Sequence, residues 1–402
     1  MRRTPKHFLI IALSCVFCAA SEAADWYDAL SQTTASADLR LRYEAVDQDN
    51  TLEDADALTF RTQLNITSGE YRGFSFTAEL EDVRVALGQG DYSVGPADFH
   101  AGIYSTIADP KTTELDQALI QYRNRHITVK AGRQIIALDD HRFVGDVGWR
   151  QDRQTFDGVT VAYSINDAVN VFYGYINQRN RIFAEAADIN SKDHLFNASY
   201  TTAMGKFVAY GYLLEEDNEA ENSIDTYGIS FTGGVKQGNL KWVYGAEAAT
   251  QSSENALADY NASYYKVEGG LLMSGITGKL MYEVLGSDEG KYGFSTPLAT
   301  LHKFNGWTDQ FLTTPAQGLE DLAVSVAAPF AGGTVTMVYH KFDINKAGTV
   351  TGDLGNEIDL QYVTSIAERV SAGVKFGRYS ANENGSGYVD TNKLWVWMGT
   401  TF

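Results

Sequence analysis

Apolar and polar residues alternate along about eighteen segments of this chain, and a period of two is typical of strands whose two faces meet different surroundings. In 57–67, for example, Leu58, Phe60, Leu64 and Ile66 alternate with polar or charged side chains. Beyond the first residues, no apolar run reaches the roughly 18 residues that a transmembrane helix needs. The sequence therefore predicts an all-β protein.

The connections between these segments alternate between short turns, such as "RNR", "IND" and "TAMG", and long polar links. The long links are 47–56, 87–114, 135–154, 178–192, 215–224, 251–259, 287–317, 343–356 and 381–390. Outer-membrane barrels have short periplasmic turns and long extracellular loops, whereas a soluble sandwich has no reason to alternate them. We therefore predict a transmembrane antiparallel β-barrel of about 18 strands, within a range of roughly 16–18.

Both ends of the chain fit the outer membrane of a Gram-negative cell. Basic residues precede a short apolar run and the sequence "SEAA", so we expect a signal peptide over 1–24, cleaved after Ala23 or Ala24. Both cysteines lie in this segment, and the mature barrel, 25–402, is expected to hold no disulfide. The last segment alternates and ends on Phe402, as the final strand of such a barrel does.

Composition extends the argument from fold to function. The chain contains 23 Tyr and 20 Phe, which suit the aromatic girdles at the two membrane interfaces. A barrel of about 18 strands leaves a water-filled lumen. We therefore expect a passive channel surrounded by outer-membrane lipid, with no nucleic-acid partner, no metal and no cofactor. The formal net charge is −19, and the surplus acidic residues lie largely in the long links. Basic residues outside these links are therefore of particular interest.

Basic side chains that face the lumen are the candidate binding residues. By parity, Arg40, Arg42, Arg61 and Arg123 oppose the apolar residues of their strands. An arginine facing lipid at the midplane would cost about 2–4 kcal/mol, which favours the inward assignment. The alternative is that these arginines form salt bridges with acidic residues of the same parity, namely Glu44, Glu79 and Glu81.

The remaining candidates lie between 126 and 158. Lys130 and Gln134 have lumen parity, and so does Arg150 when the next strand is read backwards. Arg133 has the lipid-facing parity of a regular strand. Either Gly132 marks a bulge, or the strand has already left the bilayer at that point.

Residues 131–158 read "AGRQIIALDDHRFVGDVGWRQDRQTFDG", which resembles the signature of the alginate export family of outer-membrane channels, and 296–322 is similar to a second block of marine members. The resemblance implies an eighteen-stranded monomer whose narrow, electropositive lumen passes a polyanionic uronate chain. The matching residues are Arg133, Gln134, Arg142, Trp149, Arg150, Gln151 and Asp157. It further implies that the arginines contact substrate carboxylates and that Asp157 orients one of them. An exporting member would also need periplasmic partners.

The leading hypothesis is therefore a passive, porin-like channel for an anionic oligo- or polysaccharide such as alginate or oligouronates. A general porin, or one for small organic anions, remains open. A different class is a surface adhesin or receptor that uses the acidic outer loops. An enzyme is not expected, because no Ser/His/acid set and no metal-binding spacing stands out.

Two of the long links raise questions of their own. The link 287–317 contains Phe294, Phe304, Trp307 and Phe311, so it is either a constriction inside the pore or an exterior cap. The residues "DQDNTLEDADA" resemble a calcium loop but lack the glycine at its sixth position, so calcium in the outer loops also remains open.

Overall fold

A computed structural model describes residues 26–95, 99–218, 222–255, 258–346, 352–382 and 387–402. The signal peptide expected over 1–24 lies outside these residues. Eighteen long strands form one sheet, and a two-stranded hairpin and two short 3-10 helices lie in the connections. Within the described residues, no helix is long and apolar enough to cross a membrane.

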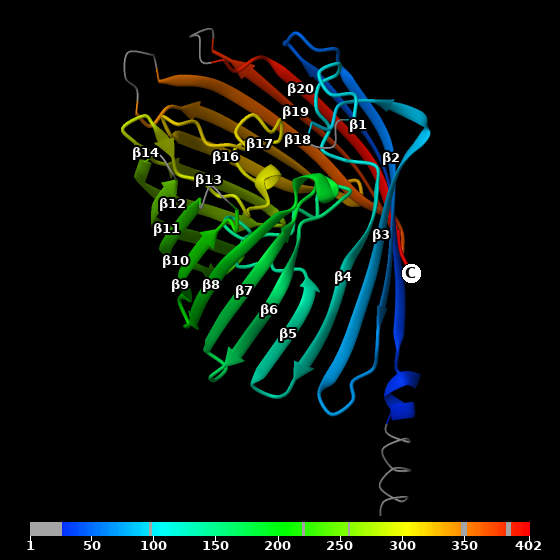
Figure 1. The fold of residues 1–402 in the computed structure, drawn as a ribbon. Coiled ribbons are helices and arrows are strands. Elements are labelled where there is room, and N and C mark those ends of the chain that lie inside the picture. The colour runs from blue at the N-terminus through cyan, green and yellow to red at the C-terminus, as the bar shows by residue number, and fades with distance from the viewer. Residues whose placement is uncertain (1–25, 96–98, 219–221, 256–257, 347–351, 383–386) are drawn as a thin grey trace, which may run out of the picture.

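The long strands follow one another around the sheet in chain order (Figure 1). Their bounds are β1 Thr34–Gln48, β2 Ala55–Thr67, β3 Phe74–Asp91, β4 Thr112–Arg123, β5 Ile127–Gln134, β6 Thr155–Ser164, β7 Val169–Asn180, β8 Ile189–Thr201, β9 Gly205–Glu215, β10 Ser223–Gln237, β11 Leu240–Asn255, β12 Ala258–Met273, β13 Ile276–Leu285, β16 Leu319–Phe330, β17 Gly333–Asp343, β18 Asp353–Ala367, β19 Val370–Ala381 and β20 Thr391–Thr401. The hairpin is β14 Ser287–Asp288 and β15 Tyr292–Gly293, and the short helices are η1 Ala184–Ala187 and η2 Leu301–Lys303.

Pairing of the first and last strands closes the sheet. β1 pairs with β20 from Asp38↔Thr401 to Gln48↔Thr391, while its other edge pairs with β2. Each remaining strand pairs antiparallel with its neighbours in sequence. Closure leaves no strand edge unpaired, which is what a sheet in lipid requires. The predicted eighteen-stranded antiparallel barrel is thus confirmed.

Short and long connections alternate around the barrel, with one difference from the predicted links. The link expected over 251–259 is reduced to two residues, because β11 extends to Asn255 and β12 begins at Ala258. The polar composition that indicated a loop belongs to strand ends. We attribute it to strands that project beyond the membrane, where both faces of a strand meet water.

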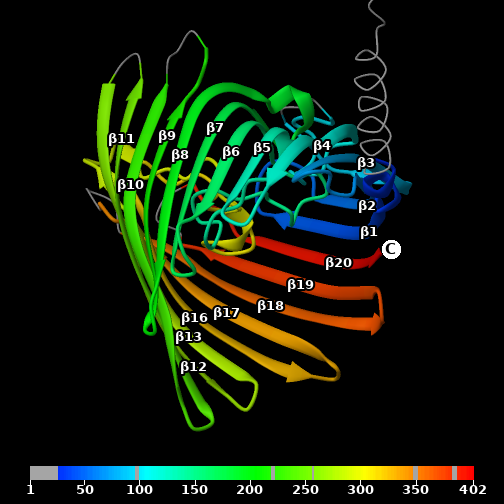
Figure 2. The ribbon, with the colours of Figure 1, turned by 90° about the horizontal axis from the view of Figure 1, so that it is seen from below.

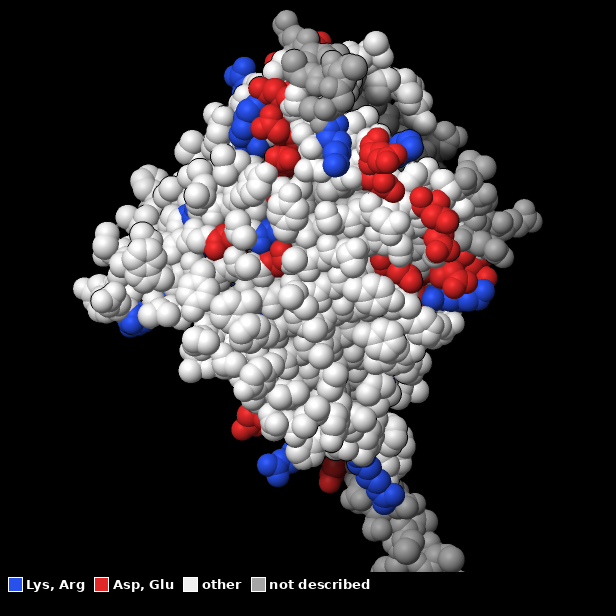
Figure 3. Space-filling model, turned by 90° about the vertical axis from the view of Figure 1, so that its left-hand side faces the viewer, with Lys and Arg blue, Asp and Glu red and all other residues white. Residues whose placement is uncertain are grey.

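The outward face of the wall is apolar. Side chains such as Phe76, Ile229, Leu280, Val324 and Met398 are between 47% and 65% exposed, and each lies on the predicted lipid-facing parity. On the face shown in Figure 3, charged side chains gather toward the upper, loop-bearing rim, and the band below them is almost free of charge. This band is the surface that hydrocarbon covers in the membrane.

Two connections, 135–154 and 287–317, fold into the barrel interior, as the view from below shows (Figure 2). The first buries Ile136 and Val144 against inward-facing residues of β7–β9, and the second buries Phe294 and Phe311 against those of β12–β19. Fully burying such side chains contributes roughly 1.5–3 kcal/mol each. The 287–317 connection is therefore an internal segment of the channel rather than an exterior cap.

Candidate functional site

The two infolded segments are joined to each other inside the lumen. The Gly145 amide donates to the Leu298 carbonyl at 2.8 Å, and the Thr300 amide donates to the His141 carbonyl at 3.0 Å. The Gln154 side chain donates to the carbonyls of both Gly145 and Leu298, at 2.9 and 3.2 Å. A continuous internal structure therefore lies between opposite parts of the wall.

Two arginines of the signature anchor this internal structure to the wall. Arg142 Nε donates to Glu283 Oε1 at 2.8 Å, and both side chains are 1% exposed. Arg150 bridges Glu44 on β1 and Asp309 on the other infolded segment, each at 2.9 Å. Burial works to lower the pKa of each guanidinium, but the paired carboxylates outweigh it and raise the pKa of Arg142 and of Arg150. Both arginines therefore stay charged and paired.

Arg40 and Arg42 of β1 face inward, and they too hold the 135–154 segment. Arg40 Nε donates to Gln151 Oε1 at 2.8 Å, and its terminal nitrogens donate to the carbonyls of Gly148 and Arg150. Arg42 donates to Asp109 and to the carbonyl of Trp149. The guanidinium groups of β1 thus bind protein acceptors, as in the alternative of internal salt bridges.

Arg133 and Asp157 do not join this lumen set. They are register partners on β5 and β6, on the face that carries Ala131 and the 41% exposed Val159. Arg133 Nε and Nη2 donate to the two carboxylate oxygens of Asp157 at 2.8 and 3.0 Å. Since β5 pairs without a bulge on both edges, Arg133 keeps the outward parity and lies at the strand end nearest the long loops.

Gln134, the next residue, points inward and is 1% exposed. Its Nε2 donates to the carbonyls of Gly132 and Gly158, at 3.3 and 3.2 Å, and its Oε1 accepts from Thr160 Oγ1 at 2.8 Å. Gly132 and Gly158 are themselves register partners. The "GRQ" and "FDG" parts of the signature therefore form one local cross-strand structure.

The other candidates are scattered. Arg61 faces inward on β2 and pairs with Asp38. Arg123 ends β4 at the periplasmic rim, where it is exposed and 3.1 Å from Glu70. Lys130 faces inward, and its register partners are Gln121 on β4 and Thr160 on β6.

The open part of the lumen is lined by lysines rather than arginines. A cavity of about 550 Å³ lies between the infolded segments and the wall of β12–β19. Its cationic lining residues are Lys266, Lys279, Lys303 and Lys375. A second cavity of about 280 Å³ adjoins it, shares Asp140, Lys266 and Glu268, and adds Lys206. The two adjoining hollows are thus lined by five lysines, among which lie the carboxylates of Asp139, Asp140, Glu247, Glu268 and Glu283.

The same parity rule that assigned the arginines would have found these lysines. Lys266 stands between the outward-facing Tyr265 and Val267, and Lys279 precedes the outward-facing Leu280. Lys303 is different, because it lies on η2 of the infolded segment and has no strand parity. Only the folded structure places it beside the wall lysines.

Aromatic side chains form the other side of the 550 Å³ cavity. Lys375 Nζ lies 4.0 Å from the ring centre of Trp149 and 4.1 Å from that of Trp307, which are cation–π distances. It also donates to His302 Nε2 at 3.0 Å, while His302 Nδ1 lies 2.7 Å from Asp309 Oδ1. Burial, together with Lys375, lowers the pKa of His302 to about 3, so this imidazole is neutral.

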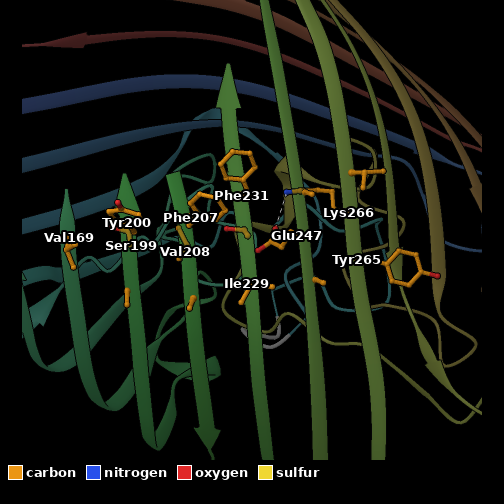
Figure 4. A pocket seen from close by; sticks show the side chains of 16 residues that line it. Val169, Ser199, Tyr200, Phe207, Val208, Ile229, Phe231, Glu247, Tyr265 and Lys266 are labelled. Atoms are coloured by element: carbon orange, nitrogen blue, oxygen red, sulfur yellow. Dashed lines mark ion pairs between the residues drawn. The ribbon is translucent and has the colours of Figure 1, made fainter. Parts of the chain in front are cut away.

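A larger hollow, of about 730 Å³, lies on the opposite side of the wall. Its apolar lining includes Tyr200, Phe207, Ile229, Phe231 and Tyr265, all of which have the lipid-facing parity (Figure 4). Because it opens toward hydrocarbon, it is not part of the conduction path. Among the described residues, no group of three or more His, Cys, Asp or Glu is placed to hold a metal ion.

Several solved structures share the fold of this chain. Pseudomonas aeruginosa OccK9 (OpdG) has a TM-score of 0.72 and 13% identity, over 93% of this chain and 100% of that chain. Acinetobacter baumannii OccAB1 has a TM-score of 0.71 and 13% identity, over 93% and 97%. Pseudomonas aeruginosa OpdK with vanillate has a TM-score of 0.70 and 12% identity, over 92% and 98%. At such identities the likeness shows the fold.

The family is shown by sequence. No curated protein matches the chain. The sequence model of the alginate export family, however, matches residues 31–280, which is more than half of the chain. Together with the closed barrel and its apolar belt, this match makes the protein an outer-membrane channel for passive transport. The chain belongs to the alginate export family.

Proposed function

We propose that the channel passes anionic oligo- or polysaccharides built from uronate units, such as alginate or its fragments, along the lysine-lined part of the lumen. The observation that carries this proposal is the 550 Å³ cavity, in which Lys266, Lys279 and Lys303 face Phe304 and Trp307. Ammonium groups attract carboxylates, and aromatic faces suit the apolar faces of sugar rings. A uronate chain presents both features at every unit.

Lysine suits a path better than arginine does. The lysine ammonium is a hydrated point charge on a flexible stem, whereas a guanidinium forms rigid two-point pairs. Conduction requires sites that bind weakly enough to release their ligand. We therefore assign the signature arginines Arg142 and Arg150, and Arg40 and Arg42 of β1, to fixing the infolded segments, and the lysines to contacting substrate carboxylates.

Small organic anions are the second candidate, and a specific comparison favours them. The solved structure of OpdK, which shares the fold at 12% identity, contains vanillate, a small aromatic carboxylate. The same combination of ammonium and aromatic groups in the present cavity suits such an acid. A cavity of this volume falls within the roughly 300–1,000 Å³ of ordinary small-ligand sites.

Reversal potentials in planar bilayers test the proposal. The mature protein, Lys266→Gln and Lys303→Gln are compared under a salt gradient, with Lys291→Gln in an exposed loop hairpin as the matched control. We expect anion selectivity that falls in the two cavity variants and not in the control. A contact between a lysine and a carboxylate of a ligand in water contributes up to about 1 kcal/mol, so each cavity substitution should weaken block by oligouronates up to about fivefold.

The same recordings separate the two candidates. Block by oligouronates that exceeds block by vanillate, and that depends on Lys266, supports the saccharide path. Block by vanillate alone favours the small-anion porin. Cation selectivity that neither lysine substitution changes would contradict both.

A further inference from the structure

Two adjacent carboxylates of the 135–154 segment form ion pairs with lysines of the cavity wall. Lys206 Nζ lies 2.9 Å from Asp139 Oδ1, and Asn197 Nδ2 donates to Asp139 Oδ2 at 2.7 Å. Lys266 Nζ lies 2.8 Å from Asp140 Oδ2. Lysines of two separate wall strands, β9 and β12, are thus occupied by consecutive residues of a single loop.

The position of these pairs distinguishes them from the anchoring pairs. Asp140 and Lys266 line both lumen cavities, so their contact lies where the 550 Å³ and 280 Å³ spaces meet. Lys266 has a second acidic neighbour, Glu247, at 3.4 Å, and Figure 4 shows this ion pair on the inner side of the wall. Lys266 therefore keeps a partner if Asp140 moves away.

Exposure also separates the two kinds of pair. The side chains of Arg142 and Glu283 are each 1% exposed. Those of the Lys206–Asp139 pair are 43% and 26% exposed, and those of the Lys266–Asp140 pair are 13% and 46% exposed. Ion pairs that water reaches contribute little to stability and exchange partners readily. The Asp139 and Asp140 contacts are therefore open to competition from a soluble anion, and the Arg142 contact is not.

The backbone beneath the two carboxylates has an uncommon conformation. Asp139 and His141 have φ values of 51° and 67°, in the left-handed region that residues other than glycine seldom adopt. Lys303 Nζ donates to the Asp140 carbonyl at 2.6 Å, which helps to hold this turn. The turn directs consecutive carboxylates toward two wall lysines at once.

Ionisation lets Asp140 act as a competing anion. Burial works to raise the pKa of its carboxyl, but Lys266 and Lys303 outweigh burial and lower the pKa. Asp140 is therefore charged at neutral pH.

We infer that Asp139 and Asp140 occupy a built-in site for two neighbouring carboxylates, formed by Lys206, Asn197 and Lys266, and that a ligand carrying two such groups displaces them. Consecutive uronate units of one chain supply this chemistry, and a single uronate does not. The inference rests on the proposed function, and it adds that the channel distinguishes chains from monomers at this site.

Single-channel block by digalacturonate and by galacturonate tests the site. The double variant Asp139→Asn/Asp140→Asn keeps the shape of both side chains and removes both charges. We expect it to strengthen block by digalacturonate by about fivefold and to change block by galacturonate less, because a competitor for an exchangeable pair is gone. Glu289→Gln, which removes one carboxylate from an exposed loop, is the control for a loss of acidic charge outside the site and should leave both values unchanged.

A second variant keeps the test decisive if the double variant does not assemble. Lys206→Gln removes one arm of the site and should lower the ratio of digalacturonate to galacturonate affinity. If block of the wild type depends on Lys266 but neither the Asp139/Asp140 nor the Lys206 substitutions change that ratio, this inference is wrong and the proposed function stands. If neither sugar blocks the wild type or the double variant, the proposed function itself is contradicted.

Discussion

Arg142 and Glu283 form a two-point ion pair between an infolded segment and the wall of the barrel, with Nε–Oε1 at 2.8 Å and Nη2–Oε2 at 3.2 Å. The Tyr264 hydroxyl and the Asn305 side chain also donate to Glu283, at 2.7 and 2.8 Å. Every strong acceptor direction of this buried carboxylate is therefore used. The pair is thus one fully satisfied anchor of the 135–154 segment, beside those that Arg150, Arg40 and Arg42 provide.

Removing only the cation of this pair is expected to be costly. Arg142→Met leaves Glu283 buried without its counter-charge, and breaking such a pair destabilises a protein by about 3–5 kcal/mol. The midpoint of urea unfolding in lipid vesicles, followed by circular dichroism, measures the loss. Arg142→Met combined with Glu283→Leu should recover most of it, because no charge is then stranded. Equal stability of the single variant and the wild type would show that water reaches Glu283.

Gly132 of the signature is not expected to tolerate substitution, because its backbone conformation and its neighbours leave no room for a Cβ. Gly132 has a φ of 120°, and a Cβ there would lie 2.2 Å from the Ala118 carbonyl oxygen. Gly132→Ala should cost about 1–3 kcal/mol and lower the yield of heat-modifiable barrel on gels. Gly278→Ala is the matched control, because nothing lies within 4 Å of its added Cβ. Equal yields from both variants would argue against strain at Gly132.

The sequence was sufficient to predict the barrel because lipid requires an apolar outward face on every strand. Leu280, Val324 and Met398 are far apart in sequence, yet the same parity places each of them outward. The alternation of short and long links added the direction of each strand. Among the predicted long links, only 251–259 was wrong, because strand ends that lie in water lack the apolar alternation that marks a strand in lipid.

The interior was less predictable because some inward-facing side chains meet water and others pack against the infolded segments. Leu195 and Val208 point inward and are buried, since they pack beneath the infolded segments rather than facing water. Parity cannot tell these cases apart. Nor can it show that Arg150 is enclosed by Glu44 and Asp309, because those partners come from distant segments.

Arg133 offers a direct comparison between the signature and the site. Because it lies on the outward face in a pair with Asp157, Arg133→Gln should leave the reversal potential under a salt gradient unchanged, while lowering thermal stability. Lys266→Gln, inside the cavity, should reduce anion selectivity. The two substitutions remove one positive charge each, so they are matched for net charge. A loss of selectivity in Arg133→Gln would place this side chain on the conduction path.

Acid is expected to loosen the 287–317 segment through His302. Its Nδ1 lies 2.7 Å from Asp309, and its Nε2 accepts from Lys375 at 3.0 Å, which is the pattern of a neutral ring. Burial lowers its pKa to about 3, whereas an unfolded histidine titrates near 6.5. Between these values the unfolded chain binds the additional proton. The contribution of His302 to stability is therefore complete above about pH 6.5 and is lost progressively as the pH falls toward about 3.

The pH dependence of thermal unfolding, followed by circular dichroism in detergent from about pH 7.5 to about pH 4, measures this contribution. His302→Gln should unfold at a lower temperature than the wild type near neutral pH, and its midpoint should fall less on acidification. Asp309, whose pKa is also lowered, acts in the same direction at more acidic pH and remains in both proteins. His126→Gln, in an exposed periplasmic turn, is the matched control and should keep the wild-type slope. An identical slope in His302→Gln would mean that the imidazole titrates alike in the folded and the unfolded chain, so that burial does not keep it neutral.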